Sequence, residues 1–474
     1  METFDEKYLN DLKNVSYIKK TYNKNGAVYT IYPQVLVNKI HEDFKIIGCK
    51  NIYYIYDNGR YSEIDENFLV KLIRKYLPEY AISRTKINDI LYLLVRRNPV
   101  RIEDFDFKNN IINFQNTLVK IDLQTCEREY YKHTHEFITT IQLNTYFNPE
   151  MMECDLWLKT LNRILSQEQI NLLQQIMGYF LIPHVKAKKF FVFHGPKDCG
   201  KSLILSVLQN ILGNENCSHV SLQNLCDPNQ RFKTVQLFGK LANICGDLNQ
   251  QAIVDTGVLK MITGEDTISG ERKGKDEFNF VCKAKNIFSC NDLPKNYNDR
   301  TNAFYERLVI IPFRESIPES EQVFNLNELL IDEYPAIVNW MMQGLEILIT
   351  NKFRFKLGEE NIQALKEYEI SNNPMLEFIP ETIKFEPGQK LHSKNLYDKY
   401  KEYCMENGYS PMSMKRFINE IIDYANNNNY SIEHSKNVSI NGKSSRGFFG
   451  LRILKDNENI GYLRLERESI EGEK

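Results

Sequence analysis

A strand, a glycine-containing turn and a helix follow one another between residues 190 and 213, and this order constrains the fold more than any other feature of the chain. Residues 190–194 read FFVFH, an apolar run typical of a strand that is buried on both faces. Apolar residues at helical spacing then continue to Gly213, namely Leu203, Ile204, Val207, Leu208 and Ile211. The sequence therefore predicts the start of a parallel α/β sheet.

The turn matches the phosphate-loop pattern G-x-x-x-x-G-K-[ST] with Gly195, Pro196, Lys197, Asp198, Cys199, Gly200, Lys201 and Ser202. Its glycines allow backbone N–H groups to converge on phosphate oxygens, and the N-terminus of the following helix attracts the same anion. Lys201 is expected to reach the β and γ phosphates, and the Ser202 hydroxyl to bind Mg2+. We therefore expect ATP and Mg2+ as cofactors, since a chance match rarely falls between a strand and a helix.

Two further apolar runs end in polar residues. LANICGD ends at Asp247, where a Walker B carboxylate would bind magnesium through water, although an aspartate can also cap a turn. NIFSC is followed by Asn291, whose amide would orient the attacking water or contact the γ phosphate; alone, it would more often be a turn residue. Leu248 and Asn249 follow Asp247 in place of a second acid, so the residue that activates water is left open.

Arg307 begins a fourth apolar run, RLVIIPF. An arginine on a strand edge, outside the phosphate loop, suits an arginine finger that acts on a neighbour's γ phosphate. A surface salt bridge is the alternative. The order of phosphate loop, acidic strand end and polar strand end is typical of an additional-strand ATPase sheet.

Composition narrows the class of protein. Lys and Arg total 60 against 62 Asp and Glu, a net charge of -2, which excludes a uniformly basic DNA-coating surface and leaves only local basic patches. The ten cysteines form no C-x-x-C pair, as in a reduced cytosolic protein. The N-terminus resembles no signal or transit peptide, and no apolar run approaches the roughly 18 residues that span a bilayer. We expect a cytoplasmic protein.

The runs GPKDCGKS, GKLANICGD, LKMITGEDTISGERKGK, NIFSCNDLP and ERLVIIPF resemble, in order and spacing, the helicase part of the poxvirus and phage primase-helicase family. This family belongs to the superfamily III helicases, hexameric AAA+ motors of viruses, phages and mobile islands. The resemblance covers about residues 100–315. Within the family, a chain of this length without a primase resembles the replication initiators of staphylococcal pathogenicity islands and related cassettes.

The resemblance implies an ATP-dependent DNA helicase and replication initiator, a homo-hexamer that translocates on DNA, usually 3′ to 5′. By position it makes Lys201 and Ser202 the Walker A residues and Asp247 the Walker B carboxylate. Asn291 becomes sensor 1, and Arg307 becomes a finger that acts across a subunit boundary. An origin-binding ATPase that assembles on DNA, or loads another helicase, is the alternative, and an unrelated P-loop enzyme such as a kinase is a third.

A basic hairpin carries DNA contacts in this family. Here the run SGERKGKDEF holds Arg272, Lys273 and Lys275, and its two glycines allow a tight turn. Three cations on a loop would track the phosphates of a single strand in the central channel. An exposed basic turn without a partner is the alternative. Lys283 and Lys285 are weaker candidates, for which solvated side chains without a partner are the alternative.

The segment 376–455 is predicted to form a small winged-helix domain, with helices from Ser393 and Ser413, a strand at 430–434, a turn at 441–442 and a strand GFFGLRIL. Its expected contacts with origin duplex are Lys415, Arg416 and Asn419 on the second helix, and Lys443 and Arg446 on the wing. A winged helix used only for protein contacts is the alternative.

The whole chain is predicted to be α/β, with an AAA+ P-loop core between an N-terminal α+β region and the winged helix. The expected divisions are an N-terminal region of unknown role (1–100), a connector with a helical collar (101–184), the ATPase (185–315), a helical connector (316–375), the winged helix (376–455) and a charged tail (456–474). Expected partners are DNA, further copies of the chain, and a primase or host replication proteins.

Overall fold

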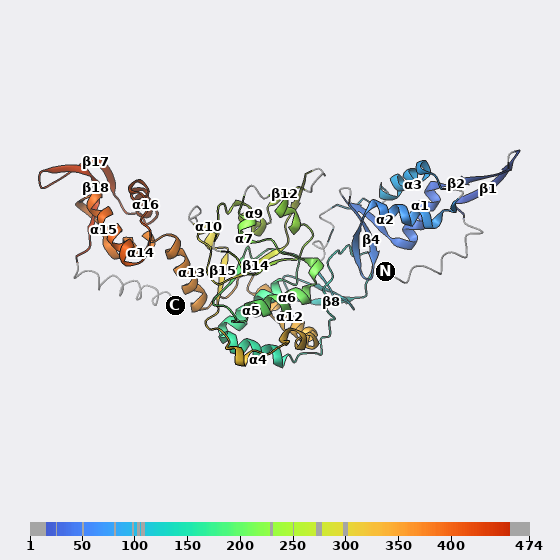
Figure 1. Cartoon of the computed structure of the whole chain (residues 1–474), viewed down its shortest axis with the longest axis horizontal. Helices are drawn as coiled ribbons and strands as arrows, with labels where there is room; N and C mark the ends of the chain where they lie inside the picture. Colours follow the sequence, from blue (N-terminus) through green and yellow to red (C-terminus); the bar gives the residue numbers. More distant parts are fainter. Residues whose placement is uncertain are drawn as a thin grey trace. The chain divides into compact units, whose positions relative to one another are not determined.

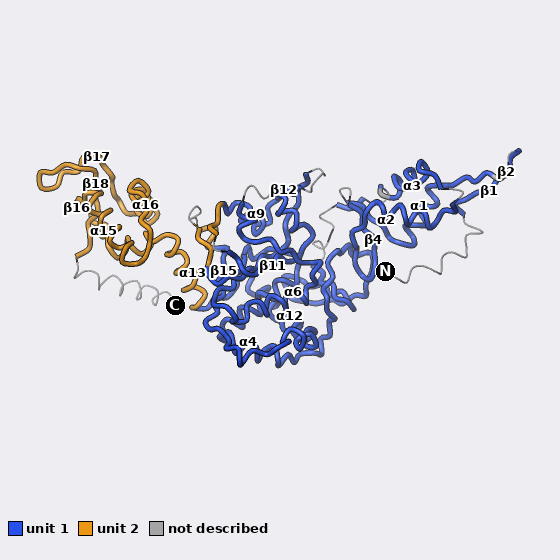
Figure 2. The backbone as a smooth tube through the Cα atoms, viewed as in Figure 1, with its two compact units in different colours: residues 1–249, 255–292, 306–359 blue, residues 250–254, 293–305, 360–474 orange. Residues whose placement is uncertain are grey.

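The computed structural model describes residues 16–24, 26–49, 52–79, 82–96, 99–101, 105, 110–227, 231–249, 251–271, 277–296 and 302–455. Two compact units divide the chain (Figure 2). Unit 1 consists of residues 1–249, 255–292 and 306–359, and unit 2 of residues 250–254, 293–305 and 360–474. The candidate nucleotide site lies in unit 1.

A parallel sheet forms the centre of unit 1 (Figure 1). Within the described residues it has five strands in the order β10-β11-β14-β9-β15, and every neighbouring pair is parallel. The strands are β9 (Phe190–His194), β10 (Cys217–Ser218), β11 (Ala242–Cys245), β14 (Lys285–Cys290) and β15 (Leu308–Pro312). The predicted α/β class with a parallel sheet is thereby confirmed.

The sheet is buried because its strands are apolar on both faces, as the sequence predicts. Phe191 and Phe193 on β9 and Phe288 on β14 have no exposed surface. The helices of this region are α4 (Asp155–Ile164), α5 (Gln167–Tyr179), α6 (Lys201–Leu212), α7 (Leu222–Leu225), α8 (Arg231–Thr234), α9 (Gly257–Gly264), α11 (Leu326–Leu329) and α12 (Tyr334–Thr350). Helix α10 (Asn302–Tyr305) belongs to unit 2.

One hydrophobic core joins the sheet to the segments before and after it. It extends from Ile112 to Ile349 and includes Trp157 of α4, Leu173 of α5 and Met341 of α12. Strands β6 (Ile111–Asn113), β7 (Leu118–Ile121) and β8 (Arg128–Tyr131) form an antiparallel sheet whose inner residues enter the same core. The helical segments before and after the ATPase motifs therefore pack against the parallel sheet through this shared core.

The residues before β6 form a mixed α+β region with its own core of apolar side chains. Its elements are β1 (Ile18–Asn23), β2 (Gly26–Ile31), α1 (Pro33–Phe44), β3 (Ile46–Cys49), β4 (Ile52–Asp57), β5 (Arg60–Ile64), α2 (Glu66–Tyr76) and α3 (Arg84–Arg96). Asp57 pairs with Arg60 across a two-residue turn, in which Asn58 and Gly59 have φ of 49° and 91°. This is the geometry that an Asn-Gly hairpin turn requires.

Unit 2 holds α13 (Glu359–Asn372, which begins at the last residue of unit 1), α14 (Met375–Thr382), β16 (Ile383–His392), α15 (Ser393–Glu406), α16 (Met414–Asn427), β17 (Glu433–Ile440) and β18 (Lys443–Ile453). Its antiparallel sheet has the order β16-β18-β17. The predicted strand at 430–434 is displaced, since β17 begins at Glu433. Strand β16 escaped prediction because its sequence IKFEPGQKLH lacks a clear apolar alternation.

No helix within the described residues is long and apolar enough to cross a lipid bilayer.

Candidate nucleotide site and nucleic-acid contacts

The phosphate loop follows β9 and leads directly into α6. Gly200 precedes the helix with φ of 93°, a left-handed conformation that glycine adopts without strain. A Cβ atom on Gly195 would lie 2.3 Å from the carbonyl oxygen of Phe313, so only glycine fits beside the strand end. Backbone conformation thus explains the glycine at position 200, and close packing explains the glycine at position 195.

Lys201 is 5% exposed and its ammonium group lies inside the loop. Its Nζ donates to the carbonyl oxygens of Gly195, at 2.7 Å, and of Pro196. It also lies 3.2 Å from Asn291 Oδ1 and 3.4 Å from Cys199 Sγ. The cation is therefore held by oxygen dipoles at the place where a phosphate-loop lysine meets phosphate oxygens.

The other predicted site residues of the loop fall into two groups. Cys199 is buried, and its thiol lies 3.0 Å from the carbonyl oxygen of Pro196. Four residues are exposed, namely Pro196, Lys197, Asp198 and Ser202. Ser202 is the second residue of α6, so its hydroxyl stands at the positive end of a twelve-residue helix.

Asp247 and Asn291 lie on the same edge of the sheet as the loop, because parallel strands end together. Asn291 follows β14 directly, whereas Asp247 comes two residues after β11, with φ of 50°. The backbone N–H of Asp247 donates to Ser289 Oγ at 3.3 Å, which connects the two strand ends. Asp247 and Asn291 are both exposed. Leu248, which follows Asp247 in place of a second acid, is buried.

This donor set suits a magnesium nucleotide. The buried Lys201 cation, the helix N-terminus and the loop N–H groups are complementary to a polyphosphate. A serine hydroxyl, a carboxylate and an amide oxygen are hard ligands of the kind that Mg2+ prefers. Ser202, Asp247 and Asn291 supply them at one edge of the sheet.

Arg307 lies at the other end of the strands, where the parallel strands begin. It immediately precedes β15, and its carbonyl oxygen accepts a 2.8 Å hydrogen bond from the N–H of Phe190, the first residue of β9. The loop follows the last residue of β9, and the five residues of a strand span about 16 Å. The Arg307 backbone is therefore a full strand length from the loop of its own chain.

The sequence did not identify the segment that borders the loop after β15. Ser316 Oγ donates to the carbonyl oxygen of Lys197 at 2.7 Å, and the N–H of Ile317 donates to that of Asp198 at 2.8 Å. Arg314, two residues before Ser316, is exposed in this segment. Its position beside the loop depends on the pairing of β15 with β9, which no local sequence pattern reveals.

The predicted channel cations Arg272, Lys273 and Lys275 lie outside the described residues. The hairpin that would carry them is described on both sides, as β12 (Thr267–Gly270) and β13 (Phe278–Val281), which pair antiparallel. The hairpin itself is therefore present as predicted, whereas its tip is not part of the described structure.

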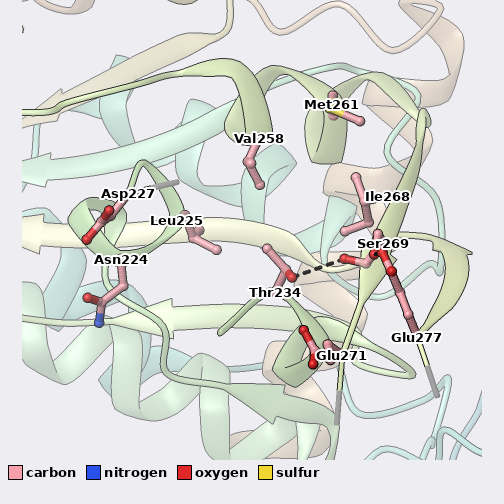
Figure 3. A pocket seen from close by; sticks show the side chains of 10 residues that line it. All are labelled: Asn224, Leu225, Asp227, Thr234, Val258, Met261, Ile268, Ser269, Glu271 and Glu277. Carbon is pink, nitrogen blue, oxygen red and sulfur yellow. Dashed lines mark hydrogen bonds between the residues drawn. The ribbon is translucent and has the colours of Figure 1, made fainter. Parts of the chain in front are cut away.

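A pocket of about 290 Å³ lies beside the described part of this hairpin (Figure 3). Thr234 Oγ1 donates to the carbonyl oxygen of Ser269 at 3.3 Å across it. Its wall is apolar on the side of α7 and α9 and carries three carboxylates; the lining residues are Asn224, Leu225, Asp227, Thr234, Val258, Met261, Ile268, Ser269, Glu271 and Glu277. The pocket contains none of the phosphate-loop residues and is unsuited to a polyphosphate.

Lys285 is neither solvated nor placed for a DNA contact. It is the first residue of β14 and is 1% exposed, and its ammonium group donates to the carbonyl oxygen of Ile182. Burial holds its pKa well below the usual range. Lys283 instead forms an ion pair with Glu265 at 3.4 Å. Neither lysine is therefore available as a free cation for DNA.

The predicted C-terminal contacts are on the surface of unit 2. Lys415, Arg416 and Asn419 on α16 are exposed, while Phe417 and Ile421 on the same helix are buried. Lys443 and Arg446 are exposed near the turn between β17 and β18. Arg416 also lies 3.8 Å from Glu420. The three candidate DNA contacts on α16 therefore lie outside the core of unit 2.

Three stretches match known families. Residues 34–166 match the D5 N-terminal-like family, residues 370–459 match the poxvirus D5 protein-like family, and residues 193–307 match a family of unknown function (DUF5906).

Solved structures of the NrS-1 C-terminal region share the fold. An A-form apo structure has a TM-score of 0.53 at 13% identity and covers 88% of this chain and 98% of that one. Another apo structure of the region has a TM-score of 0.52 at 12% identity and covers 88% of this chain and 99% of that one. At such low identity the similarity concerns the fold alone. The family matches at the two ends of the chain agree with the motifs between them, and the chain is similar to the poxvirus D5-like proteins, which are of the superfamily III primase-helicase type.

Proposed function

We propose that this protein is an ATP-dependent DNA helicase that initiates replication of a phage or mobile genetic element. The observation that carries the proposal is that Lys201, Asp247 and Asn291 lie together where the parallel strands end. Arg307 lies where these strands begin. Similarity to the D5-like family supports ATPase activity, DNA binding and oligomerisation.

Each site residue has a proposed task. Magnesium ATP, when bound, supplies the phosphoanhydride whose hydrolysis drives the motor. Lys201 neutralises the β and γ phosphates, and Ser202 and Asp247 hold the metal, Asp247 through water. Asn291 orients the attacking water, and its contact with Lys201 fixes the direction of its amide. The group that removes the proton from this water has no assignment.

Arg307 is proposed to act on the nucleotide of a neighbouring subunit. A strand length separates it from its own loop, so a finger role requires a second copy of the chain. This supports a ring, which we propose to be a hexamer, with one nucleotide at each subunit boundary. Translocation 3′ to 5′ is proposed from the superfamily.

DNA is proposed to meet two regions of the ring. Arg272, Lys273 and Lys275 are proposed to follow one strand in the central channel. The order α14, β16, α15, α16, β17, β18 supports a winged helix in unit 2. In that arrangement α16 would enter the major groove of origin duplex and the wing would contact its backbone, through the exposed residues Lys415, Arg416, Asn419, Lys443 and Arg446.

A strand-displacement assay tests the proposal. The purified protein is expected to release a labelled strand from a forked duplex only with ATP and Mg2+, and Lys201→Ala is expected to release none. If the wild type hydrolyses ATP but displaces no strand on forks with either tail polarity, the helicase proposal fails. The protein would then be an origin-binding ATPase that uses ATP to assemble on DNA or to load another helicase.

A further inference from the structure

The first two strands form a ribbon that is not needed for the core of the N-terminal region (Figure 1). Strands β1 and β2 pair antiparallel from Ile18 opposite Ile31 to Asn23 opposite Gly26. Tyr17, Ile18 and Ile31, at its base, contact that core, whereas every residue of β1 after Ile18 is exposed. The outer part of the ribbon thus has no evident role in stabilising this fold.

The ribbon is strongly basic. It carries Lys19, Lys20 and Lys24, and the chain has no aspartate or glutamate from Ser16 to His41. The three lysines are exposed, and the described structure gives none of them an ion pair with a carboxylate. By contrast Lys39, on α1, is neutralised by Asp43 at 2.8 Å. The ribbon is therefore a local patch of positive charge on a chain with a net charge of -2.

Aromatic rings accompany the cations on one face. In an antiparallel pair, opposite residues share a face, so Lys20 and Tyr22 lie with Tyr29, which is directly opposite Lys20. The Lys20 ammonium lies 5.1 Å from the ring centroid of Tyr22 and 5.6 Å from that of Tyr29. Tyr22 is 75% exposed, an unusual position for a large aromatic side chain.

We propose that the β1–β2 ribbon binds single-stranded DNA. The lysines would contact phosphates, and Tyr22 would stack on a base, the combination by which proteins hold single strands without reading their sequence. A duplex hides the faces of its bases, so the exposed ring favours the single strand. The site is separate from the ATPase and the winged helix, and rests on the proposed function only in the choice of DNA over RNA.

Fluorescence anisotropy of a labelled oligothymidine, titrated with the full chain without nucleotide, tests the site. The triple variant Lys19→Ala, Lys20→Ala, Lys24→Ala is expected to bind at least about tenfold more weakly, and the slope of log affinity against log salt to fall by about 2, since each phosphate contact contributes about 0.7. Tyr22→Ala is expected to lose roughly tenfold, and Tyr22→Phe to retain the affinity. Lys39→Ala is the matched control and is expected to bind as the wild type does.

Two results would overturn the inference. Either the triple variant binds the oligonucleotide with unchanged affinity, or it loses affinity for a blunt duplex as much as for the single strand. Urea denaturation of each variant should match the wild type, because the replaced side chains are exposed. Repeating the titration in the Lys201→Ala background separates the two proposals: loss of ATPase activity leaves the ribbon effect in place if the ribbon itself binds DNA.

Discussion

Lys201 Nζ lies 3.2 Å from Asn291 Oδ1, a contact that joins the phosphate loop to the end of β14. The two residues are ninety positions apart in sequence, and they meet because β9 and β14 are parallel neighbours whose carboxyl ends coincide. The contact couples the group that we propose neutralises phosphate to the group that we propose orients water. A substitution at either residue should therefore affect the role of the other.

Replacing Asn291 by alanine should separate hydrolysis from binding. ATP turnover is expected to fall about 100-fold or more, because a positioned polar group near the transferred phosphate is lost, while nucleotide affinity stays within a few-fold. Lys201→Ala should remove both binding and turnover. Steady-state ATPase rates and titration with a fluorescent ATP analogue measure the two effects. Lys159→Ala, on the exposed face of α4, serves as the control. Loss of nucleotide binding in Asn291→Ala would contradict the assigned role.

Arg307→Ala should bind nucleotide normally but hydrolyse it about 1,000-fold more slowly, the usual cost of removing an arginine finger. Mixing it with Lys201→Ala subunits should restore part of the activity, since a boundary with an intact loop and an intact arginine then forms. The measurement is ATPase rate against mixing ratio. A rate that never exceeds that of either variant alone would argue against action between subunits.

Replacing Lys273 and Lys275 together by alanine should uncouple the motor. ATP hydrolysis without DNA is expected to be unchanged, because the replaced residues are not part of the phosphate loop. Strand displacement should fall at least about tenfold as phosphate contacts are lost. Both rates are measured on the same preparation. Unchanged displacement would remove these lysines from the DNA path.

His184 should make stability fall in mild acid. Burial, together with the charges of Lys283, Lys186 and Lys285, lowers its pKa from 6.5 to about 3. Below pH 6.5 the unfolded chain binds a proton that the folded chain does not, so the unfolding free energy should fall by about 1.4 kcal/mol per pH unit from this group. By pH 5 its share is about 2 kcal/mol.

The test is urea denaturation at pH 7.5 and pH 5.0. His184→Gln, which keeps a donor for the 2.6 Å contact with Asn110 Oδ1, should lose about 2 kcal/mol less than the wild type between these values. Equal losses in the two proteins would show that His184 does not titrate as its surroundings imply.

Gly344→Ala should destabilise the helical packing beside the sheet. A Cβ atom at Gly344 of α12 would lie 2.0 Å from the carbonyl oxygen of Gln174 of α5, so the helices would have to separate. We expect the unfolding free energy to fall by about 1–3 kcal/mol, the typical cost of overpacking. Ile347→Ala, one turn away and 43% exposed, is the control and should cost less. Equal stability of Gly344→Ala and wild type would contradict the close approach.

Local pattern predicted much of the fold. The apolar runs predicted strands of the central sheet, and the helix expected from Ser413 is present as α16, with the Ser413 side chain capping its N-terminus. These features depend on residues close together in sequence. For Lys285 the sequence left a DNA contact and a solvated side chain open, and only the packed structure shows that its ammonium group donates to the carbonyl oxygen of Ile182 inside the core.

The sequence by itself determined the phosphate loop, because glycine conformation, lysine and serine act within eight adjacent residues. It also determined the order of strands along the chain. Only the tertiary structure decided which of these strands are neighbours, and hence that Asn291 meets Lys201 while Arg307 lies a strand length away. Strand pairing depends on burial summed over the whole core, and no single segment encodes it.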